Sequence, residues 1–136
     1  MKLFVLFFLL PCVACRSQAD VGSTEEPSEE PVPEGITYKP VGCFKDRFSP
    51  RAMPELLKNF RGTIDWNHLD KIVEKCAEEA MNKRQEYFGI QFWGECWAGE
   101  DSDLTYDQYG EDPSGCYENL VGMAMHNMVY KFDLPE

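Results

Sequence analysis

Six cysteines occur in this 136-residue sequence, and the four that follow residue 36 provide its most reactive side chains: Cys43, Cys76, Cys96 and Cys116. Cys96 follows Glu95, and two histidines occur elsewhere, so a thiol activated by a nearby base is one interpretation. That chemistry needs a reduced thiol, whereas an even number of cysteines in an oxidising compartment predicts disulfides. Zinc is disfavoured because C-x-x-C is absent from this part of the sequence and His68 and His126 lie far apart. The sequence therefore predicts two disulfides, no catalytic residue and no enzymatic activity.

Aromatic side chains gather in residues 86–99, EYFGIQFWGECWAG. Trp93 and Trp97 flank Gly94, and either indole could present a flat apolar face to a sugar ring or to a partner side chain. The more ordinary interpretation is that both rings pack in or near the core. Trp93 and Trp97 are therefore candidate binding residues with core packing as the alternative.

A third candidate site is the acidic segment GEDSDLTYDQYGEDPSGC, which ends at Cys116. Its aspartates include four at calcium-loop spacing: Asp101, Asp103, Asp107 and Asp112. The glycine that an EF-hand requires at its sixth position is Tyr106, and position twelve is aspartate instead of glutamate. The spacing predicts at most weak calcium association, and a solvated acidic loop is the simpler interpretation.

The first residues have the layout of a secretory signal peptide, with Lys2 followed by an apolar run and then small residues. Cleavage after residue 15 or 19 fits the small-residue rule, and the run is too short to span a membrane. Residues 20–36 hold six acids and three prolines without an aromatic residue, which predicts a disordered tail or propeptide. Residues 37–136 remain for one secreted, extracellular domain.

The clearest element that would position these side chains is a helix over residues 65–84. Its apolar residues recur at helical spacing on one face: Leu69, Ile72, Val73, Cys76, Ala77 and Ala80. Asp65 is the expected N-cap, since its carboxylate suits the free N–H groups of a first turn. A second, shorter helix is expected over residues 54–60, between Pro54 and Gly62.

Strand periodicity follows the helix, because Phe88, Ile90 and Phe92 alternate with Gly89 and Gln91. Further short strands are expected at residues 96–97, 38–44 and 128–132, the last two paired. The predicted fold class is α+β: one principal amphipathic helix packed on a small, mostly antiparallel sheet and stabilised by disulfides.

The expected disulfides follow from this packing. Cys76 lies on the helix face that must contact the sheet, so the sequence predicts a Cys76–Cys96 bridge, which leaves Cys43 to pair with Cys116. Four cysteines allow three pairings in all, and the other two remain open at this stage.

Five short motifs resemble, in order, those of the WSC module, a relative of the PAN/apple class of extracellular cysteine-rich domains: Gly42-Cys43-Phe44, Arg51-Ala52-Met53, Cys76-Ala77, Tyr87-Phe88-Gly89 and Gly94-Glu95-Cys96. The resemblance covers about residues 38–99. WSC modules usually carry eight cysteines, whereas Ala80 and Ala98 stand here where two of them would lie. The sequence therefore resembles a divergent WSC module with fewer cysteines, and the resemblance implies binding of carbohydrate or protein outside the cell.

The formal net charge of −11 argues against a nucleic-acid partner. Three function classes are compatible with these observations. The favoured one is a secreted, non-enzymatic recognition module for an extracellular glycan or protein. The alternative is an acidic constituent of an extracellular or mineralised matrix, with weak affinity for calcium or a mineral surface, and the third is a secreted venom or defence component.

Overall fold

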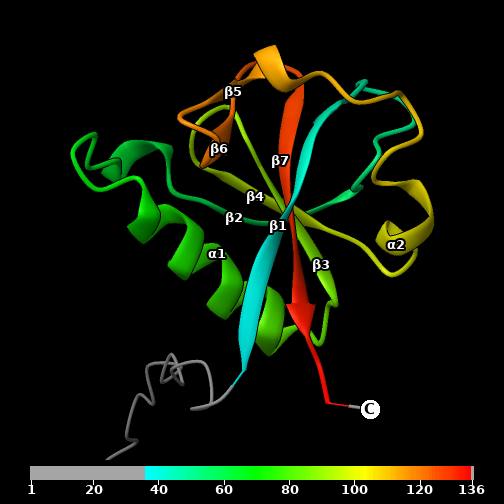
Figure 1. Ribbon diagram of the computed structural model, residues 1–136, viewed down its shortest axis with the longest axis horizontal. Helices are drawn as coiled ribbons and strands as arrows, with labels where there is room; N and C mark the ends of the chain where they lie inside the picture. Colours follow the sequence, from blue (N-terminus) through cyan, green and yellow to red (C-terminus); the bar gives the residue numbers. More distant parts are fainter. Residues whose placement is uncertain (1–35, 136) are drawn as a thin grey trace, which may run out of the picture.

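The computed structural model describes residues 36–135, which form a five-stranded antiparallel sheet with the strand order β1-β7-β3-β4-β2 (Figure 1). Its strands are β1 (Thr37–Lys45), β2 (Glu55–Asn59), β3 (Tyr87–Gln91), β4 (Glu95–Ala98) and β7 (His126–Asp133). The predicted signal peptide and all but the last residue of the acidic segment 20–36 lie outside the described residues. Within residues 36–135 no helix is long and apolar enough to cross a membrane.

Helix α1 (Asp70–Asn82) packs against β2, β3 and β4 on one face of the sheet, which confirms the α+β class (Figure 1). Its buried residues are those of the predicted apolar face. The helix begins five residues later than expected because Asp65 does not cap it: the Asp65 carboxylate accepts the backbone N–H of Asn67 at 3.1 Å in a separate turn. A side chain that accepts the backbone N–H two residues later forms an Asx turn, and such a turn competes with helix formation.

The predicted helix over residues 54–60 is wrong, because Glu55–Asn59 is the edge strand β2, paired antiparallel with β4. Pro54 packs against Gly99 beyond the end of β4, where a β-carbon would lie 2.6 Å from the proline ring. Pairing with β4 thus overrides the local preference of the sequence for a helical turn.

The strand predicted through Phe92 ends one residue earlier. Phe92 and Trp93 both have positive φ, at 48° and 63°, and form the tight turn between β3 and β4. Because two residues in the left-handed region match the twist of a hairpin, this connection needs only three residues, Phe92 to Gly94. Phe88 and Ile90 remain on the helix-facing side, as predicted.

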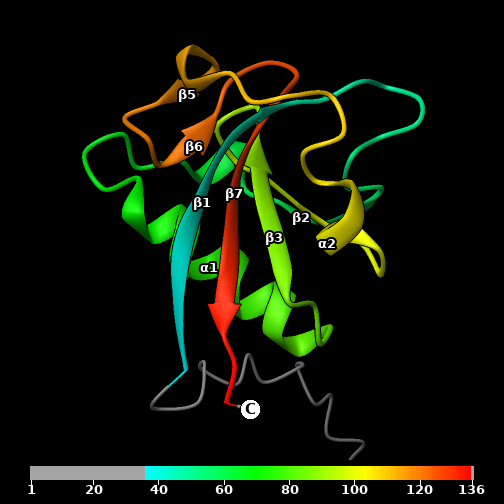
Figure 2. The ribbon, with the colours of Figure 1, turned by 45° about the vertical axis from the view of Figure 1, so that its right-hand side comes forward.

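The opposite face of the sheet is covered by residues 46–54 and by α2 (Ser102–Thr105) with the loop around it (Figure 2). Four buried side chains form a second core there: Phe44, Met53, Trp97 and Val129. Thr105 Oγ1 donates to the Ala52 carbonyl at 2.6 Å, and the Tyr109 hydroxyl donates to the Pro50 carbonyl, so the two covering segments are tied together.

Both predicted disulfides are present. Cys76–Cys96 joins α1 to β4 inside the core, and Cys43–Cys116 joins β1 to β5 (Cys116–Tyr117). Strand β5 pairs with β6 (Val121–Gly122) in a small hairpin, and two short 3-10 helices are η1 (Arg61–Thr63) and η2 (Pro113–Gly115).

Candidate functional site

The structure places the two candidate tryptophans against the core. Trp97 is 8% exposed in the second core, its Nε1 donates to Glu95 at 3.1 Å, and the Arg51 guanidinium lies 4.2 Å from the centre of its ring. Trp93 is half-buried and packs against the helix-side core. Little of the Trp97 ring is therefore left for a ligand, whereas Trp93 is still partly exposed.

A different aromatic pair reaches the surface. Trp66, in the segment before α1, is 56% exposed, and Tyr117, on β5, is 42% exposed. Their ring centroids lie 6.3 Å apart with an interplanar angle of 86°, an edge-to-face arrangement that aromatic pairs prefer. Residue type alone could have suggested Trp66, but its pairing with a tyrosine 51 positions away could not be read from the sequence.

Hydrogen bonds between three segments hold this pair in place. The Phe60 N–H donates to the Gly94 carbonyl at 2.7 Å, which ties the segment before Trp66 to the β3–β4 turn. The Trp93 N–H donates to the Gly122 carbonyl at 2.8 Å, which ties that turn to the β5–β6 hairpin. The segments that carry the aromatic pair are therefore hydrogen-bonded to one another through the β3–β4 turn.

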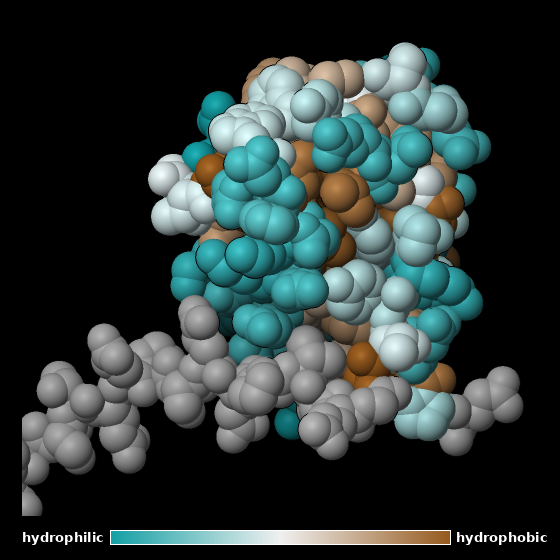
Figure 3. Space-filling model, turned by 60° about the vertical axis from the view of Figure 1, so that its left-hand side comes forward, coloured by the Kyte–Doolittle hydropathy of each residue, from teal (hydrophilic) through white to brown (hydrophobic). Residues whose placement is uncertain are grey.

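The hairpin is also anchored to the sheet, since the Tyr130 hydroxyl donates to the Leu120 carbonyl at 2.7 Å. Burial raises the pKa of the Tyr130 phenol, so it stays a neutral donor. Figure 3 views the side of the molecule that carries α1 and the hairpin, where apolar side chains reach the surface between polar ones.

A groove of about 330 Å³ lies beside the same hairpin, along β1. Apolar side chains supply much of its wall, and Glu111 and Asn119 supply side-chain polar groups. Its lining residues are Pro40, Val41, Gly42, Cys43, Glu111, Pro113, Asn119 and Met128.

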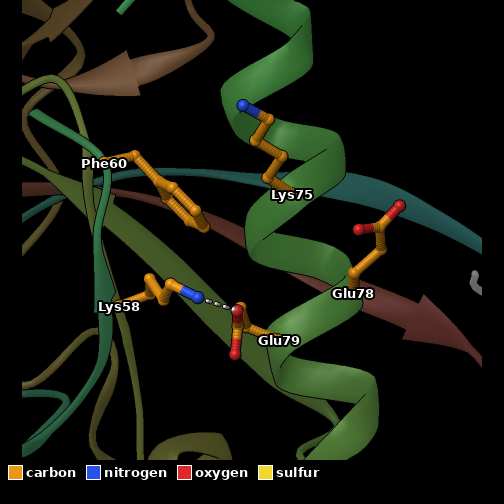
Figure 4. Close-up of a pocket in the computed structure, with 5 residues that line it drawn as sticks. All are labelled: Lys58, Phe60, Lys75, Glu78 and Glu79. Carbon is orange, nitrogen blue, oxygen red and sulfur yellow. Dashed lines mark ion pairs between the residues drawn. The ribbon is translucent and has the colours of Figure 1, made fainter. Parts of the chain in front are cut away.

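A second, smaller groove of about 140 Å³ lies between β2 and α1 (Figure 4). Lys58 and Glu79 point toward each other across it and form an ion pair at 3.3 Å. The Lys75 ammonium lies 5.8 Å from the centre of the Phe60 ring. Two of its four charged groups thus neutralise each other, which makes this groove a weaker candidate for ligand binding.

The four calcium candidates are not gathered into a metal site: within residues 36–135 no three His, Cys, Asp or Glu side chains are grouped as metal ligands. Asp101 and Asp103 lie exposed around α2, and Asp107 lies exposed after it. Asp112 instead binds His126, with 2.9 Å between Asp112 Oδ2 and His126 Nε2. An aspartate engaged in this way is poorly placed to complete an EF-hand-like loop.

This Asp112–His126 pair was not anticipated from the sequence. Asp112 also accepts from the Ser114 hydroxyl at 2.6 Å, and His126 Nδ1 lies 2.8 Å from the Ala124 carbonyl oxygen. The imidazole therefore contacts an oxygen atom through each of its two ring nitrogens. The pair joins β7 to η2, beside the Cys43–Cys116 bridge.

The first testable consequence concerns pH. The hydrogen bond from the Ser114 hydroxyl, followed by that from His126, lowers the pKa of Asp112 below its ordinary value. A lowered folded-state pKa stabilises the fold above the unfolded-state pKa of about 4, and this stabilisation is lost as the pH falls through the folded-state pKa. We expect Asp112→Asn to reduce the free energy of unfolding at pH 6 but not at the acid end of a urea-unfolding series.

The control is Asp107→Asn, because the Asp107 carboxylate has no hydrogen-bond partner in the described part of the protein. It should follow the pH profile of the unmodified protein. Equal losses for Asp112→Asn at pH 6 and at the acid end would contradict the assigned role of Asp112.

Asp46 is the second group that sequence inspection missed. Its side chain is completely buried beneath the 47–52 loop, where Oδ1 accepts the N–H groups of Arg47 and Ala52, each at 2.8 Å. Oδ2 accepts from Gln91 Nε2 at 2.9 Å and from Arg51 Nη1 at 3.2 Å. A carboxylate saturated in this way organises the loop and has no capacity left for a substrate.

No protein-family model matches this sequence, and no curated protein matches it. The site is therefore interpreted from its own geometry.

Proposed function

We propose that this protein is a secreted, non-enzymatic recognition module that binds an extracellular glycan or protein through the Trp66–Tyr117 pair. The observation that carries the proposal is the exposure of two large aromatic side chains in contact with each other on a support of three hydrogen-bonded segments. A monomeric surface rarely needs such rings for stability, and exposed apolar clusters mark binding sites.

The chemistry of the pair suits recognition. Tryptophan and tyrosine provide a large, rigid contact area with few rotatable bonds, and they dominate the binding energy at many protein interfaces. Exposed polar side chains adjoin both rings in the sequence: Asp65, Asn67 and Glu118. An apolar platform beside hydrogen-bonding groups suits a sugar ring, which has an apolar face and polar hydroxyl groups, or a protein surface that mixes apolar and polar side chains.

The predicted signal peptide and the even number of cysteines after it support an extracellular location. The WSC-like motifs support the same proposal, since that family is associated with carbohydrate or protein binding outside cells. With only four of the usual eight cysteines in the domain, the motifs bear more on the fold than on the choice of ligand.

The test is binding to a glycan array and to a panel of purified extracellular-matrix proteins. For any ligand found, Trp66→Ala should weaken binding at least tenfold, as loss of a central aromatic contact does. Phe48→Ala is the matched control, because Phe48 is 72% exposed but lies on the loop that covers the opposite face of the sheet. Binding that survives Trp66→Ala, or that Phe48→Ala reduces equally, would contradict the proposal.

One observation favours the matrix alternative: four exposed carboxylates around α2 have no ion pair or side-chain hydrogen bond within residues 36–135, namely Glu100, Asp101, Asp103 and Asp107. Under this alternative, adsorption to calcium mineral would decrease with each carboxylate neutralised. It would be insensitive to Trp66→Ala, so one set of variants separates the two functions.

A further inference from the structure

The outer edge of β1 is half covered. The Lys45 N–H donates to the Gly110 carbonyl at 3.0 Å, and the Asp112 N–H donates to the Cys43 carbonyl at 2.9 Å. Phe44 and Glu111 thus form an isolated antiparallel bridge. Among the described residues no segment pairs with the outer edge of residues 37–42. The edge therefore already accepts one short extended segment and is open where that segment ends, except that Pro40 has no N–H to donate and the register shifts between Pro40 and Gly42.

The groove along β1 lies where this pairing stops. A β-carbon at Gly42 would lie 3.3 Å from Glu111 Oε1, so the Glu111 carboxylate sits directly over the strand. Pro40 and Pro113 contribute apolar wall, and Asn119 adds an amide from the hairpin turn. The Glu111 side chain has no cationic partner within residues 36–135.

We propose that this groove binds an extended segment of a partner protein, which adds as a strand to residues 37–42 of β1 and places a Lys or Arg side chain in the groove against Glu111. In strand addition, backbone hydrogen bonds supply affinity and a side-chain pocket supplies specificity. Lysine and arginine fit this pocket because their apolar stems can lie along the prolines while the cationic head reaches the carboxylate.

The charge of the protein favours the same partner, since a formal net charge of −11 attracts basic segments and repels acidic ones. The inference goes beyond the proposed function, because neither Trp66 nor Tyr117 lines the groove. The two sites can therefore fail or succeed independently.

The test uses capped nonapeptides of alternating threonine and valine with one central guest residue: Lys, Arg, Gln or Glu. Each is titrated into the disulfide-intact, full-length protein while amide chemical shifts are recorded. We expect the Lys and Arg guests to shift the amides of Tyr38, Val41 and Gly42 and to bind about fivefold more tightly than Gln, the range of a partly exposed ion pair. The Glu guest should bind most weakly, and backbone N-methylation of the Lys peptide should abolish binding.

Variants of Glu111 assign the preference. Glu111→Gln should remove the advantage of Lys over Gln, and Glu111→Lys should shift the preference to the Glu guest. Glu118→Gln is the matched control, because Glu118 is exposed on the hairpin turn outside the groove. Trp66→Ala should leave peptide binding unchanged.

Three results would overturn the inference: a Lys preference that persists in Glu111→Gln, shifts confined to the β2 edge at residues 55–59, or no binding of any guest peptide at millimolar concentration. None of them bears on ligand binding at Trp66, so failure here is distinguishable from failure of the proposed function.

Discussion

Replacing Cys43 and Cys116 together by alanine is expected to lower the free energy of unfolding by about 4 kcal/mol. This bridge joins residues 73 apart, and in the chain-entropy model a longer closed loop restricts the unfolded state more. It also connects β1 at one edge of the sheet to the β5–β6 hairpin, so its loss frees the support of Tyr117. Urea unfolding under non-reducing conditions, followed by tryptophan fluorescence, measures the change.

The control is the second bridge. Cys76–Cys96 closes only 20 residues, for which the same model gives about 3 kcal/mol, so the Cys76→Ala, Cys96→Ala protein should be the more stable of the two double variants if chain entropy dominates. Both of these cysteines are completely buried, so their replacement also leaves unfilled core volume. A loss below about 1 kcal/mol for Cys43→Ala, Cys116→Ala would contradict the prediction.

Local periodicity explains why much of the fold was predictable. The apolar face of α1 and the alternation of Phe88 and Ile90 are patterns within single segments, and together they place Cys76 opposite the sheet. The helix face and the strand together favoured the Cys76–Cys96 pairing. Cys43 and Cys116 then had only each other as partners.

The errors arose where a distant partner decides the local structure. β2 is a strand because β4 lies beside it, although residues 54–60 carry helix-type end signals. The same applies to the candidate site: Trp66 and Tyr117 meet in a fold where the start of η1, the β3–β4 turn and the hairpin are hydrogen-bonded to one another. Single-sequence patterns hold no information about such contacts.

The buried contacts of Asp46 were likewise not predictable from the sequence, because its partner Gln91 lies in a distant segment. Asp46→Ala is expected to lower the free energy of unfolding by about 3–5 kcal/mol, the usual cost of removing one partner from a buried ion pair. The substitution leaves the N–H of Ala52 without its acceptor and leaves Arg51, whose side chain is largely buried against Trp97, without its counter-charge. Urea unfolding gives the total, and amide exchange at Ala52 reports the loop itself.

Two controls locate the cause. Asp46→Asn keeps an oxygen for the two loop N–H groups but turns a donor toward Gln91 and Arg51, so it should retain slow exchange at Ala52 while losing part of the stability. Asp103→Ala, at an exposed site, should change stability by no more than about 0.5 kcal/mol. If Asp46→Ala behaved like Asp103→Ala, the loop would be held by packing of Met53 and Trp97 alone, and the buried carboxylate would not be its organising group.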